Sequence, residues 1–276
     1  MIKIENIILR NGISIPQLWL GTYKINQACE MNELVKSALE IGYRAIDTAE
    51  HYGNEDLVGQ AIKNSGHNRK EIFLATKIWN TDQGYEKTME AFAKSQKKLG
   101  TYIDMILIHW PCPMNGLYYE TWRALQDLYK EGRVKAIGVS NFKITHLEDL
   151  KKMGGEMPMV NQIEMHPYYI QEDMLKYCKD NEIQVEAWSP LLRGGDVINN
   201  EVINKIAFNH DKSPVQIVLR YLIQLGAVVL VKSSSEMHAK QNADIFKFAL
   251  SEEEIQCIKK LNARQRTYQD PDDYYL

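Results

Sequence analysis

Several features are scarce or missing in this 276-residue chain, and each absence excludes a class of protein. Its cysteines, Cys29, Cys112, Cys178 and Cys257, are widely spread without a CxxC pair, which argues against a disulfide framework and a cysteine metal site and predicts free thiols. No apolar run is long enough to span a membrane. The net charge is −3, so no nucleic-acid or anionic-membrane partner is expected.

The sequence also lacks a signal-peptide stretch, a domain linker and the two common nucleotide-binding loop motifs. The first residues, Met1 to Glu5, lack a signal-peptide hydrophobic stretch. No Pro/Ser-rich linker or low-complexity tract divides the chain, so residues 1–276 are expected to form one domain. No G-x-G-x-x-G follows the first strand, and no P-loop occurs, which disfavours a doubly wound sheet, the second architecture considered.

What is present is a regular alternation of strand-like and helical segments. Asn11-Gly12 predicts a two-residue hairpin turn near the N-terminus. Eight strand-like runs follow, separated by helical patterns, and they predict a single (β/α)₈ TIM barrel with an N-terminal β-hairpin. The runs are Gln17–Thr22, Tyr43–Thr48, Ile72–Lys77, Tyr102–Trp110, Val134–Ser140, Pro158–Met165, Ile183–Ser189 and Ala227–Ser233.

Local signals mark several helix ends. One apolar face ends at Gly100, and a second, starting at Leu117, ends at Gly132. Ser213 precedes Pro214 as an expected N-cap, and Ser251 with Glu254 three residues later fits a capping box.

Four polar residues follow or close three of the predicted strands. Asp47, Lys77 and His109 lie at strand ends, and Tyr52 lies in the loop after Asp47. Taken singly, each has a structural explanation: an N-cap, a solvated strand end, a core histidine and a loop aromatic. Because the C-terminal strand ends of a barrel share one mouth, however, the four are expected to converge. A cation near a tyrosine is expected to lower the tyrosine's pKa and make it a usable acid.

Three longer stretches carry a resemblance to a known family: Gly42–Glu55, Asp104–Pro111 and Gly132–Phe142. Together they resemble the signatures of the aldo-keto reductases over nearly the whole chain, in particular the bacterial-type, 2,5-diketo-gluconate reductase and prostaglandin F synthase-like members. The resemblance implies that Asp47, Tyr52, Lys77 and His109 form a catalytic tetrad. It implies an NADPH-dependent reduction of aldehydes and ketones, leaves NADH open as a cofactor, and requires no metal. Tyr52 would give the proton, Lys77 would stabilise the phenolate, Asp47 would hold Lys77, and His109 would position the carbonyl oxygen.

The cofactor contacts implied by the resemblance spread along the barrel mouth. Ser140, Asn141 and Gln162 match the positions that hold the nicotinamide carboxamide, and Trp188 matches the aromatic residue under the ring. The remaining matches are Gly21 and Thr22 near the cofactor, Ser189, Leu191 and the 192–195 loop along the pyrophosphate, and Lys232 and Ser233 at the 2′-phosphate. Leu192 stands where the family often has glycine.

The adenosine end departs further from the family pattern. His238 stands where an arginine is usual, and Gln241 where a glutamate is common, while Asn242 is retained. Lys232 favours NADPH, and a neutral imidazole at His238 predicts weaker discrimination, because it cannot form the forked contact of a guanidinium with phosphate.

The expected substrate pocket is aromatic, lined by Tyr23, His51, Trp79 and Trp110. Trp19 replaces a commoner glycine and is interpreted as structural. The short C-terminal segment after Arg266, with Asp270-Pro271-Asp272, resembles bacterial-type members and predicts an open pocket. The expected partner is a small-molecule carbonyl substrate, and the protein is expected to be a cytoplasmic monomer.

Two other functions are compatible with the sequence. A Schiff-base aldolase could use Lys77 as its nucleophile, although the cofactor matches would then serve no purpose. A non-catalytic protein of the same fold could bind the cofactor as a sensor or structural component, although the intact tetrad argues against it.

Overall fold

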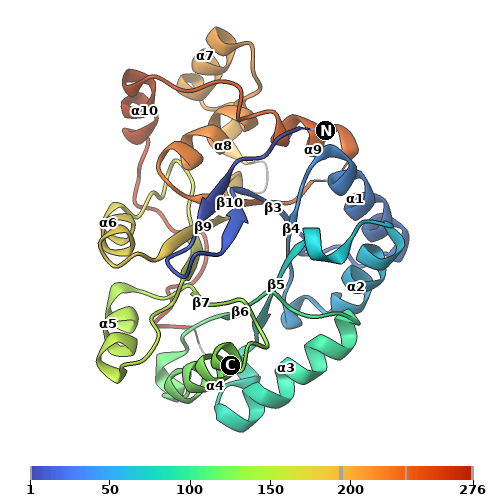
Figure 1. Ribbon diagram of the computed structural model, residues 1–276. Coiled ribbons are helices and arrows are strands. Elements are labelled where there is room, and N and C mark those ends of the chain that lie inside the picture. Colours follow the sequence, from blue (N-terminus) through green and yellow to red (C-terminus); the bar gives the residue numbers. More distant parts are fainter. Residues whose placement is uncertain (1, 193–194, 234, 275–276) are drawn as a thin grey trace.

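The structure is a computed structural model that describes residues 2–192, 195–233 and 235–274. Eight parallel strands of the described chain close into a barrel in the order β10-β3-β4-β5-β6-β7-β8-β9 (Figure 1). This confirms the predicted TIM barrel and excludes the doubly wound sheet. The strands are β3 (Leu18–Gly21), β4 (Ala45–Asp47), β5 (Phe73–Ile78), β6 (Met105–Ile108), β7 (Ala136–Ser140), β8 (Val160–Glu164), β9 (Gln184–Trp188) and β10 (Val228–Val231).

Helices surround the barrel (Figure 1). Their apolar side chains are buried. In α4, for example, Trp122, Leu125 and Leu128 are fully buried, as the helical spacing predicts. Leu117 is not on that face, because it precedes the helix and is 40% exposed. The helices are α1 (Ala28–Ile41), α2 (Glu55–Asn64), α3 (Tyr85–Leu99), α4 (Tyr118–Lys130), α5 (Ile144–Met153), α6 (Glu172–Asp180), α7 (Glu201–His210), α8 (Pro214–Gln224), α9 (Glu236–Ala243) and α10 (Glu252–Lys259).

The predicted helix-end signals are confirmed. Ser213 and Ser251 each form a capping box with the residue three positions on, which satisfies backbone N–H groups at the starts of α8 and α10. Gly100 ends α3 in the left-handed conformation, and Gly132, also left-handed, follows α4.

The N-terminal hairpin pairs β1 (Asn6–Ile8) with β2 (Ser14–Pro16) in antiparallel register. The predicted two-residue turn is wrong. The Leu9 N–H bonds to the Ile13 carbonyl, and Gly12 has a φ of +84°, so the loop holds three residues and ends in the left-handed conformation that glycine favours.

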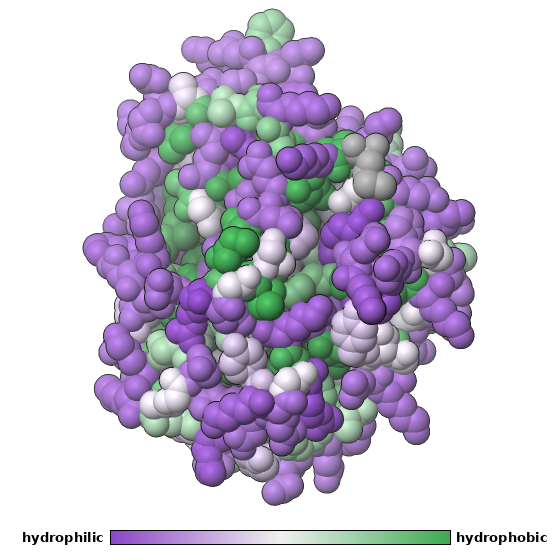
Figure 2. Space-filling model, viewed as in Figure 1, coloured by the Kyte–Doolittle hydropathy of each residue, from purple (hydrophilic) through white to green (hydrophobic). Residues whose placement is uncertain are grey.

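Figure 2 shows this side of the molecule as largely hydrophilic, with hydrophobic side chains gathered near the centre of the view. Ile8 of the hairpin is 68% exposed.

The strands are shorter than predicted at most ends, and the differences affect the site. β6 starts at Met105 rather than Tyr102, since the buried Asp104 carboxylate instead accepts from the Leu74 N–H. β5 runs one residue beyond its predicted end, so Lys77 lies within the ladder, beside Leu107 of β6. Asp47 is the last residue of β4, and His109 directly follows β6.

Candidate active site

A cavity of about 520 Å³ lies at the C-terminal ends of the barrel strands. A cavity of this size is typical of small-molecule and cofactor sites. Sixteen of the residues expected at the site line it, and they come from nearly every strand end. They are Gly21, Thr22, Tyr23, Asp47, His51, Tyr52, Trp79, His109, Trp110, Ser140, Asn141, Gln162, Trp188, Ser189, Leu191 and Lys232.

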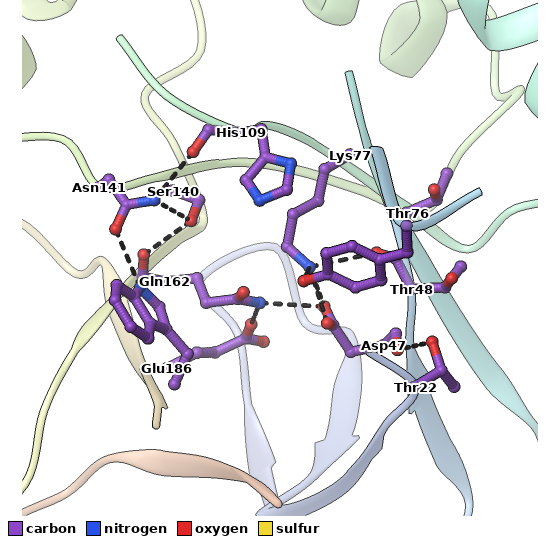
Figure 3. Close-up of polar contacts among 12 residues, drawn as sticks. Thr22, Asp47, Thr48, Thr76, Lys77, His109, Ser140, Asn141, Gln162 and Glu186 are labelled. Carbon is purple, nitrogen blue, oxygen red and sulfur yellow. Dashed lines mark hydrogen bonds and ion pairs between the residues drawn. The ribbon is translucent and has the colours of Figure 1, made fainter. Parts of the chain in front are cut away.

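Lys77 lies beneath this cavity, with its ammonium group at the centre of a hydrogen-bonded cluster (Figure 3). Its Nζ donates to both carboxylate oxygens of Asp47 at 2.7 Å and to the Thr48 carbonyl at 3.1 Å. The Tyr52 hydroxyl oxygen is 3.4 Å from the same Nζ. Tyr52 ends a short 3₁₀ helix, Glu50–Tyr52, rather than lying in an irregular loop. Three residues from β4, its following turn and β5 therefore form one unit.

These positions rule out two of the structural explanations open to the sequence. Lys77 is only 1% exposed, so it is not a solvated strand end. Asp47 ends a strand and binds Lys77, so it is not a helix N-cap. A buried ion pair is costly to desolvate and adds little stability compared with apolar packing, which makes a functional role for this pair the better explanation.

Burial and charge set the protonation of the cluster. Burial alone would lower the pKa of Lys77. The neighbouring Asp47 and Tyr52 outweigh this effect and hold the pKa of Lys77 above its usual value, so Lys77 is an ammonium. For Tyr52, burial outweighs Lys77 and raises the pKa to about 12. The expected lowering of the tyrosine's pKa is therefore wrong for this state, because desolvation of the phenolate exceeds the attraction of one cation. Burial, followed by Lys77, lowers the pKa of His109 well below its usual value, so its imidazole is neutral.

A second hydrogen-bonded group forms the opposite side of the cavity. The Ser140 hydroxyl donates to the Gln162 backbone carbonyl at 3.0 Å, and the Asn141 amide donates to the His109 carbonyl at 3.0 Å. The Trp188 indole N–H donates to the Asn141 side-chain oxygen at 2.9 Å. Asn141 has a φ of +63°, a conformation that asparagine tolerates better than most residues. The hydroxyl, the amides and the indole are thus fixed in place.

This group fits the nicotinamide end of a dinucleotide. Trp188 offers a flat aromatic surface on the cavity wall, and Ser140, Asn141 and Gln162 offer the donors and acceptors that a carboxamide requires. Gly21 gives no steric support for the assignment, since a Cβ there would make only ordinary contacts of 3.8 Å. Thr22 donates its hydroxyl to the Asp47 backbone carbonyl at 2.9 Å and so braces β3 against β4.

The loop after β9 continues the cavity. Ser189 and Leu191 line it, and Ser189 has a φ of +54°. Leu192 has a φ of +48°, a left-handed conformation that glycine adopts freely and leucine adopts at a steric cost. The remaining part of the predicted pyrophosphate loop, residues 193 and 194, lies outside the described residues.

The expected adenosine contacts divide into two kinds. Lys232 is exposed and lines the cavity, with its Nζ 3.4 Å from the Lys24 carbonyl. Ser233 and Asn242 are buried and hydrogen-bond to each other at 3.2 Å, which ties β10 to α9. His238 and Gln241 are exposed on α9 and do not line the cavity.

Aromatic rings form the outer wall. His51 stacks on Trp79 with ring centroids 3.6 Å apart, and Trp110 stacks on Tyr274 at 4.2 Å. The second contact shows that the short C-terminal segment packs against the aromatic wall. Trp19 is fully buried and donates to the Pro16 carbonyl at 2.7 Å, consistent with a structural role.

Charged groups hold the C-terminal segment in place. Lys143, just before α5, pairs with both Asp270 and Asp272, and the His146 Nε2 lies 3.0 Å from Asp272. These pairs gave no signal in the sequence, because their partners are more than 120 residues apart. The sequence interpretation also missed several further lining residues: Lys24, Pro190, Leu230, Val231, Tyr268 and Tyr274. Lys24, Pro190 and Val231 adjoin predicted lining residues, which is a signal that could have found them. Tyr268 and Tyr274 reach the cavity only through the fold of the C-terminal segment.

Within the described part of the chain, no cluster of three or more metal-ligating side chains occurs. The helices of that part include none with both the length and the apolar character needed to cross a bilayer. All four cysteines are free thiols.

Comparison with known proteins gives one consistent result. The family model described as "Aldo/keto reductase family" matches residues 17–263. A glyoxal reductase from Bacillus subtilis is 47% identical over 270 residues, which cover 98% of this chain and 97% of that protein.

Solved structures agree with the sequence relatives. An aldo-keto reductase called MGS-M4, from a deep-sea metagenome library, has a TM-score of 0.94 and 45% identity, covering 99% of this chain and 100% of its own. A mutant of Gox0644 in complex with NADPH has a TM-score of 0.94 and 39% identity, with the same coverage.

Proposed function

The chain belongs to the aldo/keto reductase family, and from that premise we propose that Asp47, Tyr52, Lys77 and His109 are its catalytic tetrad. The chain is an NADPH-dependent oxidoreductase that reduces aldehydes and ketones to alcohols. The observation that carries the proposed roles is the buried Lys77 ammonium, which binds both oxygens of Asp47 and lies 3.4 Å from the Tyr52 hydroxyl at the cavity floor.

The tetrad residues divide the work of proton delivery. When bound, NADPH supplies the hydride that reduces the carbonyl carbon. Tyr52 is protonated at neutral pH, so it donates its proton to the carbonyl oxygen as negative charge develops there. Lys77 stabilises the phenolate that Tyr52 becomes, and Asp47 keeps Lys77 charged and oriented. His109, as a neutral imidazole, hydrogen-bonds the carbonyl oxygen without competing for the proton.

The rest of the cavity would hold the dinucleotide. Ser140, Asn141 and Gln162 would bind the carboxamide, and Trp188 would support the nicotinamide ring. Gly21, Thr22, Ser189 and Leu191 would follow its length, with Lys232 as the cation for the 2′-phosphate. The bond between Ser233, which follows Lys232, and Asn242 would hold this segment against α9.

The aldolase alternative fits this geometry poorly. A lysine forms a Schiff base only as a neutral amine, whereas Asp47 and Tyr52 hold the pKa of Lys77 above its usual value. Its Nζ also has four oxygen neighbours within 3.4 Å, which leaves the nitrogen without a free lone pair to attack a carbonyl.

We infer that the substrates are small aldehydes and ketones, including dicarbonyls of the glyoxal type. The glyoxal reductase relative supports this range. The two stacked aromatic pairs, His51 with Trp79 and Trp110 with Tyr274, also support it, because they limit the space beside Tyr52. We further infer a single-domain, cytoplasmic monomer. Four free cysteines are typical of a reducing compartment, and the closed barrel leaves none of its own strands as an open edge.

The proposed function is tested by following NADPH absorbance at 340 nm with the purified chain and glyoxal at pH 7. Continuous loss of absorbance that depends on both enzyme and aldehyde is expected. A cofactor-binding protein without turnover would quench NADPH fluorescence but leave the absorbance constant. An aldolase would instead be trapped by borohydride with a ketone in the absence of cofactor.

A further inference from the structure

A second carboxyl group is buried beneath the cavity, and the tetrad does not include it. Glu186 lies in the middle of β9 with none of its surface exposed. Its Oε2 accepts a hydrogen bond from the Gln162 side-chain nitrogen at 2.9 Å. Its Oε1 is also buried and has no hydrogen-bond partner in the described part of the chain. A carboxyl group placed in a barrel core with one unsatisfied oxygen is costly, so its presence needs an explanation.

Gln162 links this acid to the tetrad. The same Gln162 nitrogen that binds Glu186 also donates to the Asp47 Oδ2 at 3.1 Å (Figure 3). An amide nitrogen has two hydrogens, and here each goes to a carboxyl oxygen. Rotating the amide by half a turn would break both bonds and set its oxygen against two acceptors. Glu186 and Asp47 together therefore fix which atom of Gln162 remains available to the cavity: the carbonyl oxygen, an acceptor for the N–H of a carboxamide.

The surroundings of Glu186 favour its neutral form. Burial raises its pKa to about 8, and among the charged groups that act on it, Asp47 on β4 raises the pKa further while Lys77 on β5 lowers it. The Gln162 hydrogen bond also lowers it. On the other flank, the paired residue of β10 is the apolar Val228. At neutral pH the region thus holds one cation, Lys77, and one carboxylate, Asp47.

We propose that Glu186 is a positioning residue for the reduction, acting through Gln162: together with Asp47 it holds the Gln162 amide with its oxygen toward the cofactor. This inference rests on the proposed function of the tetrad. Ionising Glu186 would add a second negative charge near Asp47. That added negative charge would offset part of the attraction between Lys77 and the phenolate forming at Tyr52, so the phenolate would be less stabilised.

The first expected consequence is an alkaline limit on turnover. The wild-type kcat falls above about pH 8, by roughly threefold or more at pH 9.5, as Glu186 loses its proton. Glu186→Gln keeps an oxygen for the Gln162 N–H but cannot ionise. Its kcat at pH 7 stays within about twofold of wild type, and the alkaline fall is lost. A wild-type profile that is flat to pH 9.5, or a Glu186→Gln profile with the same fall, overturns the proposal.

The second consequence concerns binding, which is measured without turnover. Glu186→Leu removes the acceptor and releases the Gln162 amide, so NADPH should bind about 5- to 10-fold more weakly in a fluorescence titration at pH 7, the scale of one lost hydrogen bond. Glu55→Gln is the matched control, because Glu55 is another buried glutamate, bonded to Thr76 and Ser95, that does not line the cavity. It should leave both the NADPH affinity and the alkaline fall unchanged. Equal NADPH affinity in Glu186→Leu and wild type would contradict the role given to Gln162.

The third readout uses the protein without cofactor. A carboxyl group whose pKa rises from 4.5 to about 8 on folding stabilises the fold fully below pH 4.5, and this stability is lost as the pH rises to about 8. The free energy of unfolding should therefore fall less steeply between pH 5 and 8 in Glu186→Gln than in wild type. Identical slopes would show that Glu186 is already ionised and would end the proposal. If instead these slopes differ but wild type consumes no NADPH, the proposed function has failed, while the conclusion that Glu186 is a buried, protonated acid still holds.

Discussion

The two ends of the cofactor cavity are built in opposite ways. At the inner end, the side chains of Asp47, Lys77, Asn141 and Gln162 are nearly or fully buried. Lys77 and Gln162 both donate to Asp47, and Asn141 donates to the His109 carbonyl. At the outer end, Lys232 is exposed on the cavity rim, and His238 lies on the surface of α9. The proposed catalytic groups are thus held by hydrogen bonds in the protein interior, whereas the proposed phosphate contacts come from exposed side chains.

This contrast has an energetic reason. Charges stabilise a developing oxyanion best when they are pre-oriented in a low-dielectric site, whereas an exposed cation gains only modest energy from each phosphate contact. Substitutions at the inner end should therefore reduce turnover strongly, and those at the outer end should shift the choice of cofactor.

The largest effect in this series is expected for Lys77→Met. It should reduce kcat at least ~10²-fold, because Tyr52 loses the cation that stabilises its phenolate. Asp47→Asn should be impaired less, since Asp47 acts on the phenol only through Lys77. Steady-state kinetics with NADPH and glyoxal would rank the two variants.

Both changes strand a partner of a buried pair, which typically destabilises a protein by about 3–5 kcal/mol. Circular dichroism and thermal melts must therefore show that each variant is folded at the assay temperature. Normal aldehyde reduction by folded Lys77→Met would refute the proton-delivery scheme.

Lys232→Met should weaken NADPH binding by about tenfold and leave NADH almost unchanged. Lys232 lines the cavity, and its ammonium is the proposed contact for the phosphate that distinguishes the two cofactors; a charge-assisted hydrogen bond has this scale. Fluorescence titrations with both cofactors at one fixed salt concentration would measure it. Lys240→Met, an exposed lysine of α9, is the matched control and should change neither affinity. Equal losses for NADH and NADPH in Lys232→Met would show that Lys232 does not read the phosphate.

The smallest effect is expected for His238→Arg, which should strengthen NADPH binding by up to about tenfold and barely alter NADH binding. A guanidinium can form a forked contact with phosphate that a neutral imidazole cannot. His238 lies on exposed α9 outside the cavity lining, so the gain depends on the longer arginine reaching the phosphate. The same titrations apply, with His238→Gln as the uncharged control. An equal gain for NADH would point to nonspecific attraction.

Much of the inner end could be predicted from the sequence, because its residues fall at strand ends that a barrel brings to one mouth. The eight strands, the capping residues Ser213 and Ser251, and the approach of Lys77 to Asp47 all followed from local pattern and topology. The resemblance to a family then supplied the roles.

What could not be predicted depends on distant contacts or on burial. The stacking of Tyr274 on Trp110 needs a chain reversal held by Lys143, which no local pattern reveals. The raised pKa of Tyr52 depends on how completely the fold desolvates it. Glu186 looks in the sequence like one polar residue in a strand, and only the structure shows it beneath Gln162.

We propose that the inner end of the cavity performs the chemistry and that cofactor binding is separable from it. One sample of Tyr52→Phe tests this directly when NADPH affinity by fluorescence and glyoxal-dependent turnover at 340 nm are measured together at pH 7. We expect a loss of at least ~10²-fold in kcat with an NADPH Kd within about twofold of wild type, because the hydroxyl gives the proton but does not hold the dinucleotide. Turnover close to wild type, or a loss fully explained by weaker NADPH binding, would contradict it.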